Sequence, residues 1–112
     1  MNKIVAVLLL LTIYSCRKKD IEPGVPGPVE KHIVEFSKDP VCDDAHVDEY
    51  TFQQKTVYVF DYGTCGADMV SVVEDADGKN VGSLGGYSGN MIINGEKFDS
   101  ATFIRVVWEK KP

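Results

Sequence analysis

Positive charge, histidine and cysteine are all scarce in this chain of 112 residues. It carries 12 basic residues against 17 acidic ones, which gives a formal net charge of −5, and it holds two histidines and three cysteines. A nucleic-acid-binding domain needs a basic face, and this composition does not supply one. We therefore expect no nucleic-acid partner, and few residues are left that could build a catalytic or metal-binding centre.

Long apolar runs are absent beyond the first twenty residues. Residues 4–13 are apolar except for Thr12, and Lys3 precedes them. A membrane-spanning helix needs roughly 20 apolar residues. This shorter run has the length and the charged flank of a secretory signal peptide, so the sequence predicts export and no membrane-spanning helix.

The next residues resemble the cleavage site of bacterial lipoproteins. In Ile13-Tyr14-Ser15-Cys16, an aliphatic residue, a small residue and a cysteine stand where a lipobox has them, although Tyr14 lies where a small side chain is preferred. We expect a signal peptide over residues 1–15 and a lipidated Cys16, which would anchor the protein in the cell envelope. The outer membrane is the expected site, on its periplasmic or its surface face. An ordinary secretory signal ending near Cys16 is the alternative.

Export bears on the two remaining cysteines. Cys42 and Cys65 are an even pair, and such a pair in an exported protein predicts a disulfide. The bond would close a loop of about two dozen residues and stabilise a small domain by roughly 3–4 kcal/mol. Two free buried thiols are the alternative.

The mature chain is predicted to be a tether followed by one domain. Residues 16–31 contain three prolines, and proline-rich segments favour an extended path. We expect a lipid-linked tether over this segment and a single domain over residues 32–112.

Strand-forming segments predict a mainly β fold: a small antiparallel β-rich domain of about five strands, stapled by the disulfide, with room for one short helix. Residues 55–62 are apolar on both faces and predict a central strand. Residues 32–38 alternate and predict an edge strand. Residues 69–74 and 80–84 flank Asp77-Gly78, which is a two-residue hairpin signal.

Other segments are less uniform. Residues 85–90 predict a glycine-rich loop, and residues 91–98 predict a short apolar strand with a turn at Asn94-Gly95. Residues 43–50 fit either a short helical turn or an acidic loop. Residues 101–109 favour a strand because they are rich in β-branched side chains, with a helix as the alternative.

Metal binding is not expected. Cys42, His46 and Cys65 could offer three zinc ligands, but a structural zinc site needs four ligands at clustered spacing. The acidic segment 74–80 superficially resembles a calcium loop. With Asp75 at its first position, however, glycine falls at position 4 and not at position 6.

A catalytic set is also not expected, nor is a cofactor. Ser88 directly precedes a glycine, so the loop 85–90 does not match the Gly-x-Ser-x-Gly elbow. A serine triad needs a histidine base, and only His32 and His46 exist. The same loop lacks the Lys-Ser or Lys-Thr of a phosphate-binding loop.

Aromatic side chains are the remaining candidates for recognition. Aromatic residues dominate the energetics of binding surfaces, and we name Tyr87, in the glycine-rich loop, and Trp108 as the predicted binding surface. Packing of Tyr87 against the sheet edge is the alternative.

Several segments of the chain together resemble a known family. These are "DEYTFQQKTVYVFDYGTCGADM", "DADGKNVGSLGGYSGN", "NGEKF" and "VVWE", of which "CGADM" and "LGG" followed by "GN" are the most specific. They resemble a family of small Bacteroidota lipoproteins, which is classified only as a domain of unknown function. Many members carry further cysteines near the positions of Gly78, Gly82 and Ile93, so any cross-link or metal role of those cysteines does not transfer. The resemblance implies an address and boundaries and implies no activity.

The function predicted from sequence is a non-catalytic module of the cell envelope that binds a protein or glycan partner. An inhibitor of envelope or extracellular enzymes, with residues 85–90 as its reactive loop, is the alternative. A small hydrolase comes third. It predicts that Ser88 or a histidine is essential for turnover, and a cleft shared by these residues would favour it.

Overall fold

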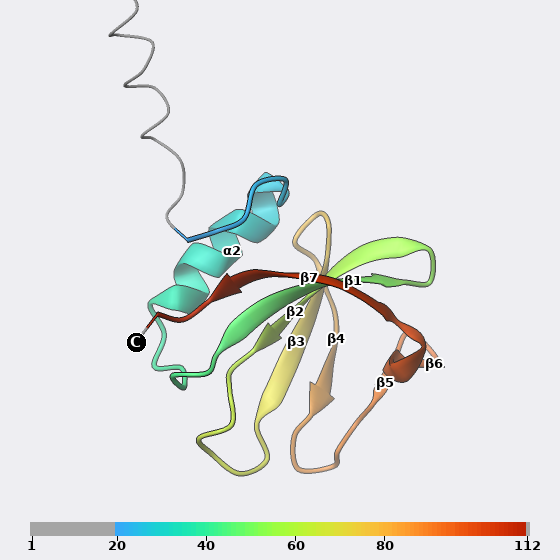
Figure 1. Cartoon of the computed structure of the whole chain (residues 1–112). Helices are drawn as coiled ribbons and strands as arrows, with labels where there is room; N and C mark the ends of the chain where they lie inside the picture. The colour runs from blue at the N-terminus through green and yellow to red at the C-terminus, as the bar shows by residue number, and fades with distance from the viewer. Residues whose placement is uncertain (1–19, 112) are drawn as a thin grey trace, which may run out of the picture.

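Five antiparallel strands form the main sheet, in the order β4-β3-β2-β1-β7 (Figure 1). The computed structural model describes residues 20–111. The strands are β1 (His46–Phe52), β2 (Lys55–Asp61), β3 (Val70–Asp75), β4 (Asn80–Gly85) and β7 (Thr102–Glu109). The remaining elements are α2 (Gly27–Ser37), the strand pair β5 (Ile92–Ile93) and β6 (Glu96–Lys97), and the short 3-10 helix η2 (Phe98–Ser100). The predicted mainly β fold with one helix is confirmed.

Strand β2 is the central strand that its composition predicts. Val57 and Val59 point to one face of the sheet, Tyr58 and Phe60 point to the other, and all four are at most 7% exposed. A strand that is apolar on both sides requires cover on both faces. Two separate groups of elements provide that cover.

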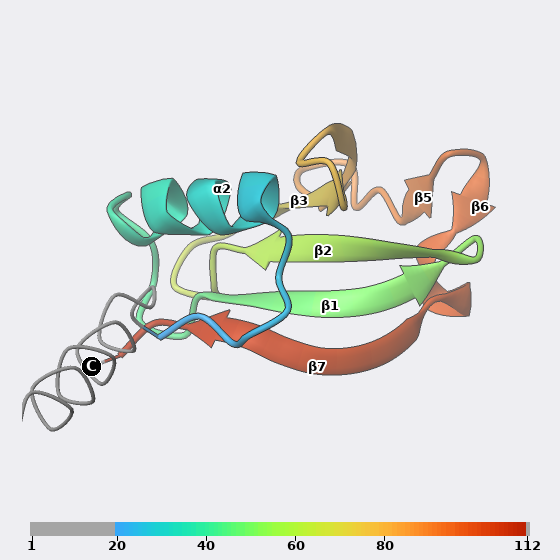
Figure 2. The ribbon, with the colours of Figure 1, turned by 90° about the horizontal axis from the view of Figure 1, so that it is seen from above.

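Helix α2 covers one face, over the half of the sheet where β7 ends (Figure 2). Val29, Ile33 and Phe36 are its buried residues. The Phe36 ring packs edge-on against Phe60 and Trp108, with ring centroids 5.4 and 5.7 Å away. Such edge-to-face contacts add to the burial of the apolar area.

The predicted edge strand at residues 32–38 is wrong, because residues 32–37 belong to α2 and Lys38 is its C-cap. The buried positions of α2 are spaced by four and three residues, which is helical spacing. The alternation that suggested a strand spans too few residues to separate the two periods. Pro28 stands in the first turn, where a proline breaks no helical hydrogen bond.

The predicted tether over residues 16–31 is also wrong for its described part. Ile21 is 5% exposed, and the Glu22 backbone N–H donates to the Val107 carbonyl at 2.9 Å. The chain therefore packs along the outer edge of β7 before it enters α2. The signal peptide and Cys16 lie outside the described residues. Within residues 20–111, no helix is both long enough and apolar enough to cross a membrane.

Strands β5 and β6 lie at the end of the sheet away from the C-terminus (Figure 2). Ile93 of β5 and Phe98 of η2 pack on the other face of the sheet, in a core separate from that of α2. The core on this side joins seven buried side chains: Phe52, Val57, Val59, Val73, Leu84, Ile93 and Phe98. The turn predicted at Asn94-Gly95 is confirmed, and both residues have positive φ, at 50° and 80°.

The helical turn or acidic loop predicted over residues 43–50 is wrong from His46 onward, since β1 begins there. Pairing decides this: β1 lies between β2 and β7 and is hydrogen-bonded to both. The hairpin of β3 and β4 is confirmed, but its connection is four residues long, 76–79, and not the two-residue turn that Asp77-Gly78 suggests. Residues 102–109 form a strand and not a helix.

Candidate functional site

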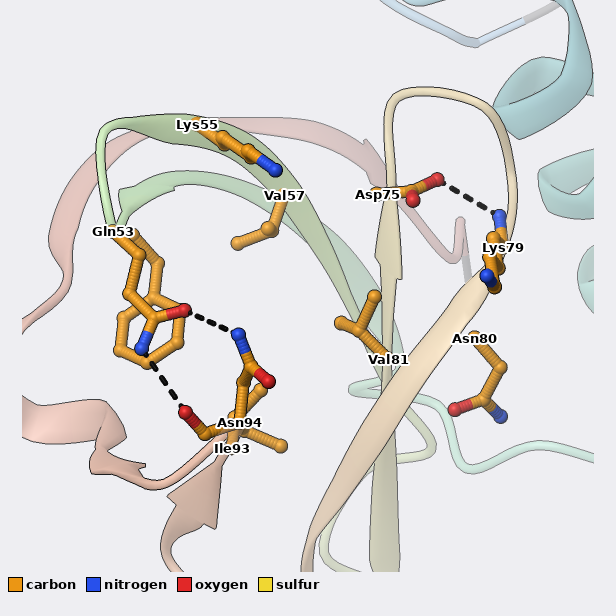
Figure 3. A pocket seen from close by; sticks show the side chains of 10 residues that line it. Gln53, Lys55, Val57, Asp75, Lys79, Asn80, Val81, Ile93 and Asn94 are labelled. Atoms are coloured by element: carbon orange, nitrogen blue, oxygen red, sulfur yellow. Dashed lines mark hydrogen bonds between the residues drawn. The ribbon is translucent and has the colours of Figure 1, made fainter.

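A pocket of about 390 Å³ opens at the end of the sheet where β1 turns into β2 (Figure 3). This volume lies in the ~300–1,000 Å³ range of small-molecule sites. Three hairpins contribute to the lining, which consists of Phe52, Gln53, Lys55, Val57, Asp75, Lys79, Asn80, Val81, Ile93 and Asn94. Apolar side chains form the floor, and the rim is polar or charged.

The β1–β2 turn builds one wall of the pocket at a conformational cost. Gln53 and Gln54 both have positive φ, at 52° and 63°, as a two-residue turn of this hand requires. Glycine or asparagine is the usual choice there, and a left-handed backbone costs other residues roughly 1–2 kcal/mol. The Gln53 side chain uses this position to reach Asn94. Its amide donates to the Asn94 carbonyl at 3.2 Å, and its Oε1 accepts from Asn94 Nδ2 at 2.8 Å.

The floor depends on a close approach between β4 and β5. Ile93 is 1% exposed beneath the pocket. A Cβ on Gly82 would stand 2.7 Å from Ile93 Cδ1, and Gly82 has a φ of +149°. Glycine alone combines this backbone angle with the space that Ile93 occupies.

The charged groups on the rim differ in how they are engaged. Asp75 Oδ1 accepts the backbone N–H groups of Asp77 and Lys79, at 2.9 and 3.0 Å, and so closes the β3–β4 loop. Within residues 20–111, neither Lys55 nor Lys79 has a carboxylate within 4.0 Å. Two lysines and one aspartate give this lining a net charge of +1, in a chain whose net charge is −5.

The family model described as Domain of unknown function (DUF6970) matches residues 35–110. The chain belongs to this family. No curated protein gives a significant match, and neither does any solved structure. The family assignment covers the whole sheet and every residue of the pocket, and it brings no activity with it.

The residues considered for catalysis do not come together. His32, on α2, contacts Glu74 Oε1 through Nδ1 at 2.8 Å. His46, on β1, contacts Asp48 Oδ1 through Nδ1 at 2.9 Å. Ser88 lies in the exposed loop between β4 and β5, and no hydrogen bond within residues 20–111 joins it to either histidine.

Asp48 and Glu74, the two acids beside the histidines, are buried, and the pKa of each is raised. Burial raises the pKa of Asp48, and the hydrogen bond from His46 opposes that effect. Burial likewise raises the pKa of Glu74, against the hydrogen bond from His32. The His32–Glu74 pair joins α2 to β3, whereas His46 and Asp48 lie on the same strand, β1. We assign both pairs a structural role.

The cysteines considered as zinc ligands form the predicted disulfide. Cys42 and Cys65 are bonded, with their Cα atoms 5.6 Å apart. Within residues 20–111, no group of three or more histidine, cysteine or acidic side chains is placed to hold a metal ion. The disulfide ties the segment between α2 and β1 to the β2–β3 loop.

The two aromatic residues of the predicted binding surface have opposite environments. Tyr87 is 95% exposed, at the tip of a loop closed by two backbone hydrogen bonds between Gly85 and Asn90, at 2.7 and 3.1 Å. Trp108 is 7% exposed and packs on Phe36. The structure thus leaves Tyr87 available for contact and places Trp108 in the core, so Trp108 is not part of a binding surface.

Sequence reasoning did not find the pocket residues. Gln53, Lys55, Lys79 and Asn94 belong to three different turns, and none of them carries a motif of its own. The available signal is indirect: the sequence predicts turns at Asp77-Gly78 and Asn94-Gly95, but it does not predict β1. Without β1 there is no reason to place the turn after Phe52 beside the other two.

Proposed function

We propose that this protein is a non-catalytic, lipid-anchored binding module of the cell envelope, with the pocket of Figure 3 as its ligand site. The observation that carries this proposal is the pocket itself, because it combines an apolar floor with charged side chains that form no ion pair within residues 20–111. Convergent polar groups over an apolar floor are the usual composition of a ligand site. The separation of Ser88 from both histidines supports a binding role over hydrolysis.

The path of the N-terminal segment supports an outward-facing pocket. With lipid on Cys16, only residues 17–20 would separate the anchor from buried Ile21. An extended chain covers at most ~3.6 Å per residue, which holds Ile21 within about 18 Å of the anchor. The Glu22 backbone N–H is hydrogen-bonded to the Val107 carbonyl, near the end of β7. The pocket lies at the opposite end of the strands. We propose the outer membrane of a member of the Bacteroidota as the site of this anchor.

A second candidate function is protein binding or enzyme inhibition through the loop 85–90. The exposure of Tyr87, at 95%, is the observation that favours it. Asn90 holds this loop by donating from Nδ2 to the carbonyls of Ser83 and Ile92, at 2.8 and 3.0 Å. A firmly held loop with one projecting aromatic ring loses little freedom on binding.

Chemical crosslinking in native membranes tests the proposal and separates the two candidates. Three forms are compared: the wild type, Val81→Trp, which fills the pocket, and Tyr87→Ala, which removes the exposed ring. We expect Val81→Trp to lose the crosslinked or co-purified material and Tyr87→Ala to retain it. The reverse pattern would replace the pocket with the loop, and equal capture by all three forms would refute both sites. Intact mass measurement of the same material shows whether the chain begins at an acylated Cys16.

A further inference from the structure

The free polar groups of the pocket indicate the charge of its ligand. Lys55 and Lys79 offer ammonium donors with no ion-pair partner in the described chain. The single acid of the lining, Asp75, accepts two backbone N–H groups at its Oδ1 atom. Two lysines outnumber the one carboxylate of the lining, so the pocket favours a ligand that supplies negative charge and acceptor atoms.

The remaining walls indicate the body of the ligand. Figure 3 shows Val57 and Val81 facing the space between the two sides of the pocket, with Lys55 above it. Asn94 donates from Nδ2 to Gln53, and its Oδ1 points towards the same space (Figure 3). An amide oxygen accepts a hydrogen bond from a hydroxyl group, while the valines suit the C–H face of a ring.

We propose that this pocket binds an acidic sugar, with its carboxylate attracted by the positive charge of Lys55 and Lys79 and its ring over Val57 and Val81. This inference rests on the proposed binding function and specifies the ligand class of the same site. The volume of about 390 Å³ accommodates a ligand of this size. The turns around Gln53 and Asn94 close one side of the pocket and leave no exit there for a continuing chain. The sugar would therefore be the terminal residue of a glycan.

An acidic peptide terminus fits the same charge less well. Capture of a terminal carboxylate typically uses a concave set of backbone N–H groups. In this pocket the backbone N–H of Lys79 is spent on Asp75 at 3.0 Å, and the side chains alone supply the positive charge. Asn94 Oδ1 can accept a hydrogen bond from a sugar hydroxyl group, and a peptide carboxylate has no such donor. Peptide binding is therefore an outcome of the test and not the proposal.

The test compares two sugars that differ at one carbon. D-glucuronate and D-glucose share a ring and differ in carrying a carboxylate or a hydroxymethyl group. Each is titrated into the full chain in mild detergent, with binding followed by isothermal calorimetry or by amide NMR shifts. We expect glucuronate to bind at least about tenfold more tightly than glucose, as a charged hydrogen bond implies, and to weaken at about 0.5 M salt.

Two variants assign that binding to the pocket. The double variant Lys55→Gln with Lys79→Gln should reduce glucuronate affinity to that of glucose. Lys38→Gln is the matched control, because Lys38 is an exposed lysine at the end of α2, and it should bind as the wild type does. Far-ultraviolet circular dichroism confirms that all forms are folded.

Three results would overturn the inference. One is equal binding of the two sugars, the second is glucuronate binding that survives the double lysine substitution, and the third is binding of a carboxyl-terminal acidic peptide in place of glucuronate. These results leave the broader proposal standing if Val81→Trp still abolishes capture in membranes. If one of these results is found and Val81→Trp also captures partners as the wild type does, the pocket is rejected as a binding site altogether.

Discussion

Replacing Gly82 with alanine tests the contact that lets β5 close the floor of the pocket. The new Cβ would stand 2.7 Å from Ile93 Cδ1, and the residue has a φ of +149°. The backbone angle costs a residue other than glycine roughly 1–3 kcal/mol. Forcing a methyl group into a packed core costs about 1–3 kcal/mol more. We therefore expect Gly82→Ala to lower the free energy of unfolding by about 2–6 kcal/mol, which is a large part of the ~5–15 kcal/mol total of a small domain.

Two further variants separate the two costs, with urea denaturation of the oxidised protein as the assay. Gly89→Ala is the control for the backbone, because Gly89 has a φ of +64° and nothing lies within 4 Å of its added Cβ. It should lose only about 1–2 kcal/mol. Ile93→Val removes the clashing Cδ1 at its own cost of about 0.5–1.5 kcal/mol. The double variant Gly82→Ala with Ile93→Val should then be more stable than the sum of the single losses predicts, and strict additivity would refute the proposed clash.

Three other predictions concern the disulfide, the buried acids and the strained turn. Replacing Cys42 and Cys65 with serine should lower stability by about 3.4 kcal/mol for a separation of 23 residues, and reduction of the wild type should match it; an unchanged urea midpoint would contradict this. Burial raises the pKa of Glu74 above its ordinary 4.5. As the pH falls through that raised value, the folded state therefore binds more protons than the unfolded state. This carboxyl group then contributes increasing stability until the pH reaches about 4.5. Urea midpoints from pH 7 to pH 4.5 should therefore rise for the wild type relative to Glu74→Gln, and parallel curves would count against the shift. Gln54→Gly should raise the melting temperature by several degrees, because it relieves a φ of 63° and gains about 0.5–1 kcal/mol; a lower melting temperature would show that the turn is not strained.

Local patterns were sufficient where a segment meets the same environment along its whole length. Residues 55–61 are apolar on both faces, and they lie in the middle of the sheet. Asn94-Gly95 forms a turn because both residues tolerate positive φ. The pairing of Cys42 with Cys65 follows from the even count of cysteines that remains if the chain is exported as predicted. In each of these cases one local property points to one structure.

Local patterns failed where a short segment fits two structures equally well. Residues 32–38 alternate over too few positions to distinguish a strand from a helix, and α2 is selected by the core that Phe36 enters. Residues 46–50 are too acidic to suggest a strand, yet β2 and β7 supply their hydrogen-bond partners on both sides. Trp108 is an aromatic residue of the kind that is common in binding surfaces, yet it is buried against α2.

The sequence by itself determined the mainly β class, the central strand, the disulfide and the expectation of export, because each depends on composition or on neighbouring residues. Only the tertiary structure decided that residues 20–37 pack on the sheet and that the pocket exists. The pocket needs Gln53, Lys79 and Asn94 at one end of the sheet, and these residues come from three separate turns. Their proximity depends on strand order and register, which arise from contacts between distant parts of the chain and leave no pattern within any one segment.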